Sequence, residues 1–508
     1  MSIGSALSIA TGGLAVVSNN LALVSQNVAN ANTPNYAVES ATQTSLNAAG
    51  AGLGVLVGPS TRQIDTALQA EGFRQNATVA GLQTRQAALQ AVDSAQGTPG
   101  QGQDLPSLLA AVQNQFSSLL NTPDNQTQQS AVIAAAGTLA TGINALSTAC
   151  TAQRQAAQDD IVSSVQTLNT ALGTIGTLTN QIIGLRAANQ STADLENQRD
   201  AALTTVSGLV DVKVLNQPNG GIVLSTSGGL ALPLTGSGAT LTDTGANVQT
   251  GAYYPAGGIP GVTLNGTDVT AQLTGGRIGA DLALRDATLP TYQGELDEFA
   301  ETLATRFDAQ GLTLFTDPTG ALPVSTGTPV QTGYVGFAAT IQVNPAVTAN
   351  PASVRDGTAS IAGSPTGASA FTQNPAGGPA GFTTLIQRVL TYALGTEAQS
   401  GVPQPTPNTT GLGPNGTLNA PYVAPASLSD QAVTMVASQS QDSADTTSKL
   451  ATEQAVQTNI NSRMTAISGV SMDTEMSTMI RLQNAYGANA KVIATTQALW
   501  SQLLAMVQ

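Results

Sequence analysis

Among the residues of this chain, three carboxylates on one predicted helix have the spacing that best suits acid–base catalysis. Asp297, Glu298 and Glu301 fall within about one helical turn, and two such carboxyl groups can act as general acid and general base. A simpler explanation is that the three acids lie on the solvent-facing side of the helix, and we expect this placement for all three. Asp159 and Asp160 lie near an expected helix start, where acids interact favourably with the helix dipole.

The remaining residue types exclude most catalytic and metal sites. The chain has no histidine and a single cysteine, Cys150, so a Ser-His-Asp triad, a His-ligated zinc and an intrachain disulfide are all excluded. None of the three lysines (Lys213, Lys449 and Lys491) has a serine three residues before it, as a Ser-Lys dyad of the Ser-x-x-Lys type requires. No phosphate-binding loop occurs. We therefore predict no enzyme activity and no cofactor, with Cys150 as a small apolar core residue.

The composition sets the class of protein. Of 508 residues only 9% are charged, against about 25% in an average globular protein. The net charge of −14 argues against nucleic acid as a partner. Because 41% of residues are apolar, the chain can bury a core and is not disordered by composition. The length favours several domains.

Both ends of the chain carry apolar residues at alternating spacings of four and three, the pattern of a coiled-coil seam. Residues 1–38 contain no Asp, Glu, Lys or Arg, and residues 486–508 contain only Lys491 among these four types. A solvated helix normally carries charge opposite its apolar stripe. Two amphipathic helices on a globular core are the simpler alternative. We favour a coiled coil of both termini, buried among neighbouring subunits. The expected subunit-interface residues are Ile3, Leu7, Leu14, Val17, Leu21, Val24, Val28, Met476, Tyr486, Ile493, Trp500 and Leu504.

An asparagine-rich turn follows the first predicted helix. Its residues Asn27, Asn30, Thr33, Pro34 and Tyr36 resemble the signature N-x-[AS]-N-x-x-T-x-G-[YF] of the axial proteins of the bacterial flagellum, which comprise rod, hook and hook-associated proteins. Asn35 replaces the usual glycine, a mild change because asparagine also tolerates positive φ. Residues 468–476 and 483–493 are similar to the C-terminal patterns of the same proteins.

Two interior segments narrow the resemblance to the hook-associated protein 1 (FlgK) family. Residues 194–200, which read DLENQRD, resemble that family's D-L-x-x-Q-R-D pattern, and residues 275–286 resemble its G-G-x-[IL] pattern with a following R-D. The resemblance covers roughly residues 1–310 and 427–508. It does not extend over 312–425.

These patterns predict a mainly α fold with β insertions, in which paired terminal helices, a long-helix bundle and distal β domains follow one another outward. Runs of 3.6-residue period alternate with period-two runs and Gly-rich turns. The predicted parts are a terminal coiled-coil assembly domain, a helical bundle, a small β domain and a variable outer β domain rich in Gly, Pro and Thr. Their bounds are 1–36 with 470–508, 37–208 with 276–311 and 427–469, 209–275, and 312–426.

The resemblance implies a structural subunit that joins the flagellar hook to the filament by self-assembly through its terminal helices. Its implied partners are further copies of itself, the hook protein, a second junction protein or filament-side subunits, and an export chaperone. The family reaches the cell exterior by type III export without a cleaved signal peptide. This agrees with our expectation that residues 1–32 are no secretory signal and that no segment spans a membrane. The alternatives are a hook or distal rod protein, or a secreted adhesive protein.

Overall fold

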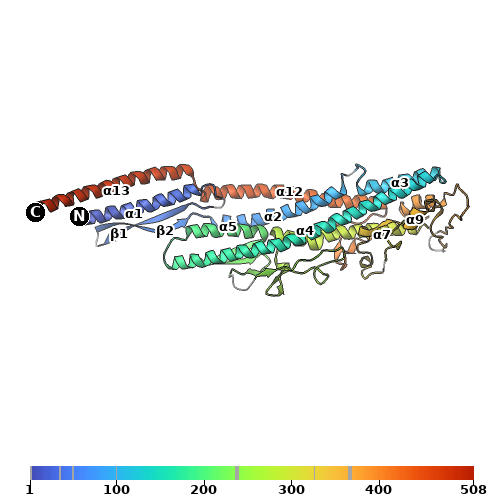
Figure 1. Cartoon of the computed structure of the whole chain (residues 1–508), viewed down its shortest axis with the longest axis horizontal. Helices are drawn as coiled ribbons and strands as arrows, with labels where there is room; N and C mark the ends of the chain where they lie inside the picture. The colour runs from blue at the N-terminus through green and yellow to red at the C-terminus, as the bar shows by residue number, and fades with distance from the viewer. Residues whose placement is uncertain are drawn as a thin grey trace.

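The protein is an elongated, mainly helical rod with both chain ends at one extremity (Figure 1). Its structure is a computed structural model of the whole chain. A mainly α architecture with small β insertions and paired terminal helices is confirmed. The structure describes residues 3–33, 36–48, 51–98, 100–234, 240–324, 326–363 and 369–507.

The terminal unit consists of the two end helices and a long hairpin. Helix α1 (Ile3–Ala29) lies between helix α13 (Met472–Val507) and the ribbon of strands β1 (Glu39–Ala48) and β2 (Ala51–Arg62). The strands are antiparallel, with Glu39 opposite Arg62 at the open end of the hairpin. Figure 1 shows α1 and α13 running in opposite directions.

Long helices form the body of the rod. Side-chain caps fix where several of them start, because the caps satisfy backbone N–H groups that lack a helical partner. Asp65, Asp104, Asn125 and Ser427 accept these N–H groups ahead of α2, α3, α4 and α12. The body helices are α2 (Thr66–Gln96), α3 (Leu105–Asn121), α4 (Gln126–Ala187), α5 (Ala193–Leu209), α6 (Gly276–Ala283), the π-helical turn η2 (Leu284–Thr288), α7 (Leu289–Asp308) and α12 (Leu428–Ser468).

The strands predicted between residues 209 and 275 form two three-stranded antiparallel sheets, ordered β3-β4-β5 and β6-β7-β8. Their inward side chains share one hydrophobic core with the second half of α4 and with α5 and α6, including Leu168, Val206, Leu224 and Ile278. The strands are β3 (Val212–Asn216), β4 (Ile222–Thr226), β5 (Ala231–Leu232), β6 (Leu241–Thr242), β7 (Thr263–Leu264) and β8 (Thr267–Asp268), followed by η1 (Thr270–Gln272).

The segment 312–426 differs from the outer β domain expected there. Its described residues form short helices and three small two-stranded ladders, and apolar side chains such as Phe315, Phe337 and Leu385 join the core of α3, α4 and α7. Frequent Gly and Pro keep each strand short. The elements are β9 (Phe315–Thr316), η3 (Val330–Gly333), α8 (Phe337–Thr340), β10 (Gln342–Val343), α9 (Pro345–Ala349), α10 (Ser353–Asp356), α11 (Thr384–Arg388), η4 (Val389–Ala393), β11 (Glu397–Gln399), β12 (Val402–Pro403), β13 (Thr410–Leu412) and β14 (Leu418–Asn419).

Two helices have the length and apolar composition that a membrane-spanning helix needs. The sequence patterns above predict no membrane-spanning segment. The two helices are the stretch Gly4–Ala29 of α1 and the helix Gln126–Ala187, which is α4. Such a test also selects core helices of soluble proteins. In α4 many side chains, such as Ile143 and Ile161, are fully buried in the protein's own cores.

Candidate assembly site and its junction to the rod

The contact between the terminal helices uses a different side of α13 from the heptad row read in the sequence. In α13 the side chains of Glu475 and Thr496 are buried, and Leu482 and Asn489 are half-buried. A Cβ atom added to Gly13 of α1 would lie 3.1 Å from Asn489 Oδ1, so a glycine at that position allows close approach of the two helices. The predicted pairing of the two terminal helices is therefore confirmed. The predicted heptad row of α13, however, largely faces away from α1.

The structure divides the predicted interface residues into two groups. On α1, Val17 and Val24 are buried, and Leu7, Leu14, Leu21 and Val28 are half-buried. On α13, Ile493 is half-buried, but four of the five predicted residues are exposed, namely Met476, Tyr486, Trp500 and Leu504. The Ile3 side chain lies outside the described residues. Within one copy, α1 has its partners, whereas the predicted row of α13 largely lacks them.

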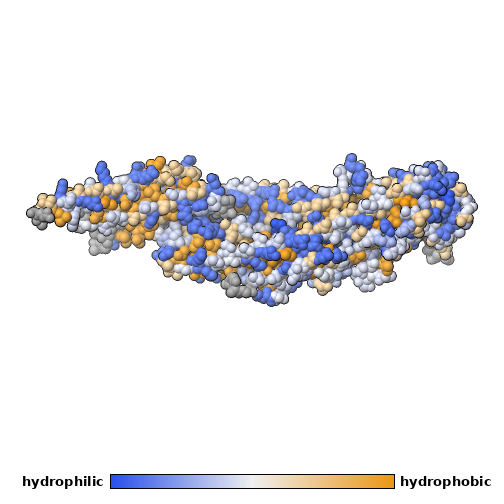
Figure 2. All heavy atoms as spheres, viewed as in Figure 1, coloured by the Kyte–Doolittle hydropathy of each residue, from blue (hydrophilic) through white to orange (hydrophobic). Residues whose placement is uncertain are grey.

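The last turns of α13 form an apolar projection. Figure 1 shows the C-terminal end of α13 extending beyond the start of α1. Every described side chain from residue 497 to 506 is exposed, and Trp500 and Leu504 each keep more than half of their surface open, at 54% and 55%. Leu499, Leu503 and Met506 are exposed beside them. Figure 2 shows apolar surface along this terminal part of the molecule.

The asparagine-rich turn works through the side chain of Asn27. This amide is buried and binds both backbone groups of Glu39: Nδ2 donates to the carbonyl oxygen at 3.0 Å, and Oδ1 accepts the N–H at 3.0 Å. Tyr36 Oη also donates to Asn27 Oδ1 at 3.1 Å, and Thr33 Oγ1 donates to Asn30 Oδ1 at 3.2 Å. Pro34 lies outside the described residues. Asn27 thus fixes the direction in which the chain leaves α1 and enters β1.

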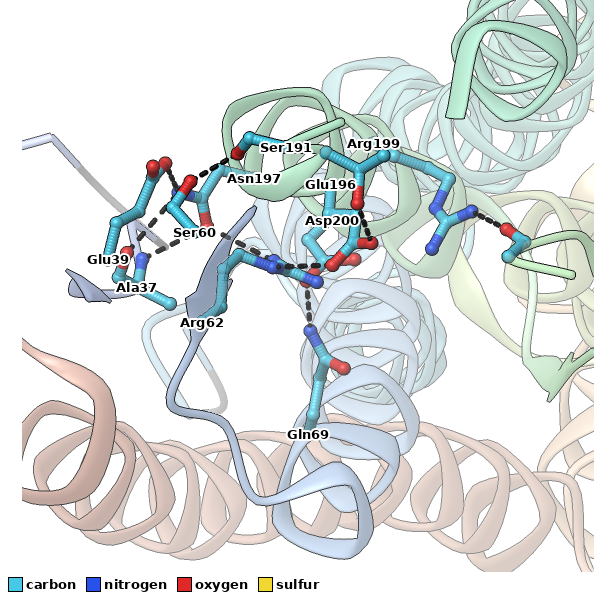
Figure 3. Close-up of polar contacts among 12 residues, drawn as sticks. Ala37, Glu39, Ser60, Arg62, Gln69, Ser191, Glu196, Asn197, Arg199 and Asp200 are labelled. Carbon is cyan, nitrogen blue, oxygen red and sulfur yellow. Dashed lines mark hydrogen bonds and ion pairs between the residues drawn. The ribbon is translucent and has the colours of Figure 1, made fainter. Parts of the chain in front are cut away.

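A polar junction joins this turn to the rod, built on the DLENQRD segment at the start of α5 (Figure 3). Asn197 Oδ1 accepts the N–H of Ala37 at 3.2 Å, and its Nδ2 donates to Glu39 Oε1 at 3.1 Å. Arg62, at the end of β2, donates to Glu196 Oε2 at 3.1 Å, to Asn197 Oδ1 at 3.1 Å and to Asp200 Oδ2 at 2.7 Å. One helix therefore holds both strands of the hairpin.

Charges in this polar junction are compensated although they are buried. The Arg62 side chain is 4% exposed, and those of Glu196 and Asp200 are 12% and 8% exposed. Burial acts to raise the pKa of Glu196, but hydrogen bonds from Thr192 and Arg186, together with the charge of Arg62, bring that pKa below its ordinary value. The carboxylate form of Glu196 is therefore the one that the fold stabilises.

The C-terminal half of the chain meets the same junction. The backbone N–H of Val38 donates to the carbonyl oxygen of Ser468, the last residue of α12, at 2.7 Å. Gln69 of α2 donates to Asp200 Oδ2 at 2.6 Å. The sequence pattern of residues 194–200 indicates a family resemblance but does not predict a role for these residues. Their function depends on partners far away in the sequence.

The acidic cluster of α7 consists of Glu295, Asp297 and Glu298, and its burial contradicts the solvent-facing role expected for Asp297 and Glu298, whereas Glu301 on the same helix is half-buried. Asp297 and Glu298 are each 3% exposed, as is Glu295, and burial raises the pKa of Glu295 and of Asp297 to about 7. The sequence gives a partial signal for this burial, because Leu296, Phe299 and Leu303 flank the acids on the same helix. The sequence alone does not predict that these acids are buried, because the segment that covers α7 comes from residues 330–410.

Cys150 is a core residue, as predicted. It is 1% exposed, and burial raises the pKa of its thiol to about 12, so the nucleophilic thiolate is disfavoured. A groove of about 970 Å³ between α2, α4, α5 and α6 contains Asp160, Arg277 and Asp281. Asp159 and Asp160 lie in the middle of α4, so the expectation that they lie near a helix start is wrong. Arg277 pairs with Asp160, and burial beside Asp160 raises the pKa of Asp281 to about 9. This arrangement is a structural ion pair next to a neutral acid.

Comparisons with known proteins give family matches for the interior and for the C-terminal end of the chain. Residues 89–321 match the family described as the flagellar hook-associated protein FlgK helical domain, and residues 461–506 match the C-terminal region of flagellar basal body rod FlgEFG proteins. A solved structure of the flagellar hook junction protein FlgK from Burkholderia pseudomallei is similar, with 22% identity and a TM-score of 0.41. That match covers 51% of this chain and 46% of the solved one, so the chain spans about half of its length. Comparison with curated proteins gave no match.

Proposed function

Because this chain belongs to the FlgK family of flagellar hook-associated proteins, we propose that it is a structural subunit of the junction between the flagellar hook and the filament. The terminal unit is the part that assembles, and the rod positions it. The observation that carries the proposal is the unpartnered apolar row of α13, with Met476, Tyr486, Trp500 and Leu504 exposed in a single copy.

Assembly supplies the partners that one copy lacks. Burying a large apolar side chain stabilises a complex by roughly 1.5–3 kcal/mol, and each subunit contributes several such side chains from α13. The almost uncharged surface of the terminal helices supports the same role, since an unpaired charge buried between subunits would be costly. The apolar row of α1, from Leu7 to Val28, packs within the terminal unit and so holds α13 in place for this interface.

The partners follow from this position in the flagellum. They are further copies of the chain, the hook protein on one side, and a second junction protein or filament-side subunits on the other, with an export chaperone before assembly. The protein is extracellular, reaches its site by type III export without a cleaved signal peptide, and acts without enzyme activity. The long helices from residue 66 to 209 favour this role over that of a hook or rod protein.

The test is complementation of a strain that lacks the gene with a double variant, Trp500→Asp and Leu504→Asp. We expect loss of motility, with hooks retained and flagellin released into the medium, because two charges replace apolar contacts between subunits. The melting temperature of the purified variant should hardly change, since both side chains are exposed.

The matched control is Val423→Asp, which places a charge at an apolar side chain that is 87% exposed but lies outside the terminal unit. That strain should swim normally. Normal motility and filament attachment in the double-variant strain would overturn the proposal. Deletion of residues 472–508 gives the stronger form of the same test and should leave a folded rod that does not enter flagella.

A further inference from the structure

A pocket in the terminal unit contains a buried acid whose carboxylate has no partner. The pocket has a volume of about 480 Å³ and lies where α1, the first residues of β1 and the start of α13 meet. Glu475 lines it and is 8% exposed. Its backbone N–H donates to the carbonyl oxygen of Ser471, but among the described residues no donor or cation contacts its carboxylate. A buried carboxylate without a partner is costly, so this group is suited to a cation from outside the copy.

The same pocket is acidic and opens to the surface. Glu39 also lines it, and Glu39 Oε1 accepts a hydrogen bond from Asn197 at 3.1 Å. Gln43, Gln63 and Thr474 line the pocket and are exposed, so the pocket can be entered from outside. A metal ion usually takes more than two carboxylates, and no group of three possible metal ligands occurs in the part of the chain that the structure describes. These features favour an ammonium or guanidinium group as the occupant.

Lys491 is the matching cation of the terminal unit. It is exposed, and residues 486–508 contain no other Asp, Glu, Lys or Arg. Within the described residues, no carboxylate oxygen lies within 4.0 Å of its ammonium group. It lies among the apolar side chains of α13 that the proposed function buries between subunits, where an unpaired ammonium group would be costly. The other exposed cation of α13, Arg481, already donates to Thr478 Oγ1 at 2.9 Å.

Lys491 cannot reach the pocket of its own copy. It follows Glu475 by 16 positions on the same helix, which is about 24 Å along the axis. Side chains of one helix meet when they are three or four positions apart, and α13 is one continuous helix from Met472 to Val507. The acid and the cation can therefore meet only if they belong to two different copies.

We propose that the pocket between α1, β1 and α13 receives Lys491 of a second copy, whose ammonium group pairs with Glu475. This inference rests on the proposed function, because it names one contact between assembled subunits. It also fixes an arrangement, in which copies of the same polarity are displaced from each other by about 24 Å along α13. Two desolvated charges stabilise an interface only where they meet. The apolar row of α13 therefore supplies the affinity, and this pair selects the axial register.

The experiment is zero-length crosslinking of flagella purified from the native strain. A carbodiimide joins an ammonium group to a carboxylate in direct contact as an amide, with loss of one water. The chain has only three lysines, Lys213, Lys449 and Lys491, so crosslinked peptides are few and can be assigned by mass spectrometry. We expect a peptide pair that joins Lys491 to Glu475, together with a dimer of the 50.9 kDa chain on a denaturing gel.

The outcomes separate this contact from the proposed function. If the flagella contain the protein but Lys491 is joined to no acid, or only to other acids, the contact is overturned and the junction role stands. If the protein is absent from purified flagella, the junction role fails and the contact fails with it.

A charge exchange gives the second arm. Lys491→Glu brings two acids together, so the swimming halo should fall to less than half of the wild-type diameter. Because Lys491 is exposed, the melting temperature of this variant should hardly change. Addition of Glu475→Lys in the same chain restores an opposite pair and should recover most of the halo.

The matched control is Arg481→Glu, which reverses the other exposed cation of α13. Glu475→Lys should not improve swimming in that background, because Arg481 is not the group that the pocket receives. A folded exchange variant without recovery would contradict the proposal. If Glu475→Lys prevents folding, the crosslink in the wild-type protein decides.

Discussion

The polar junction beneath the terminal unit and the acidic cluster of α7 bury acids in opposite ways. At the junction, Arg62 contacts Glu196 and Asp200, and Arg186 contacts Glu196. On α7, Glu295, Asp297 and Glu298 have amide, hydroxyl and backbone donors but no cation among the described residues. The pKa of Glu196 is lowered, whereas the pKa values of the three α7 acids are raised.

The difference teaches that burial alone does not determine what a carboxyl group contributes. A carboxylate with a guanidinium partner stabilises the fold in its charged form, and breaking the pair leaves an uncompensated charge. For Glu295 and Asp297, which have neutral donors only, desolvation raises the pKa further than the hydrogen bonds lower it. The junction is therefore expected to stabilise the fold at neutral pH, whereas the burial of Glu295 and Asp297 should cost stability as the pH rises through about 7.

Removal of the shared cation of the junction should have the largest effect. Arg62→Met keeps the side-chain length but leaves Glu196 and Asp200 buried beside each other, so we expect a loss of about 3–5 kcal/mol in the free energy of unfolding. Urea denaturation at pH 7 measures it. Arg74→Met is the matched control, because the Arg74–Glu71 pair is solvent-exposed, with side chains 61% and 41% exposed. It should cost at most about 1 kcal/mol. Equal losses in both variants would contradict the distinction.

Removal of a charge from the acidic cluster of α7 should act in the opposite direction. Glu295→Gln should raise the free energy of unfolding at pH 8 by roughly 1–3 kcal/mol, because the wild-type carboxylate is ionised and half unsatisfied there. At pH 4 the wild-type group is protonated, so the two proteins should have nearly equal stability. Urea denaturation at both pH values gives the comparison, and a destabilised variant at pH 8 would refute it.

Glu196→Gln should show the smallest change and the opposite pH dependence. At pH 7 we expect a loss of about 1–2 kcal/mol, since the charged group accepts from Arg62, Arg186 and Thr192. Because the folded pKa is lowered, the wild-type advantage exists above about pH 4.5 and disappears as the pH falls through the folded value. Thermal melting between pH 3 and 7 tests this, and a difference that grows in acid would argue against it.

Much of the fold could be read from the sequence because its signals are local. The 3.6-residue period predicts long helices within residues 37–208 and 427–469, and the structure has α4 and α12 there. The end motifs and the interior pattern around residues 194–200 indicated the family, and the matches at 89–321 and 461–506 confirm it. The sequence did not correctly predict the structure of the segment 312–426. Its short apolar runs pack on α7 and α3 instead of pairing into the expected sheet.

The candidate site was only partly predictable for the same reason. Spacing identified the apolar residues of both terminal helices, but it did not decide which side of α13 meets α1. That depends on the close approach at Gly13 and on the buried Glu475 and Thr496. The use of the exposed row as a subunit interface stays a prediction.

The sequence by itself determined the charge-poor ends, the helical periods and the exclusion of histidine chemistry, since each depends on residue type and spacing along the chain. Tertiary structure decided which acids are compensated. Asp200 and Asp297 are both aspartates within helices, yet one meets an arginine from β2 and the other meets backbone amides of residues 336 and 338. Those partners lie 138 and about 40 positions away, and the pKa of a buried group depends on what the fold places beside it.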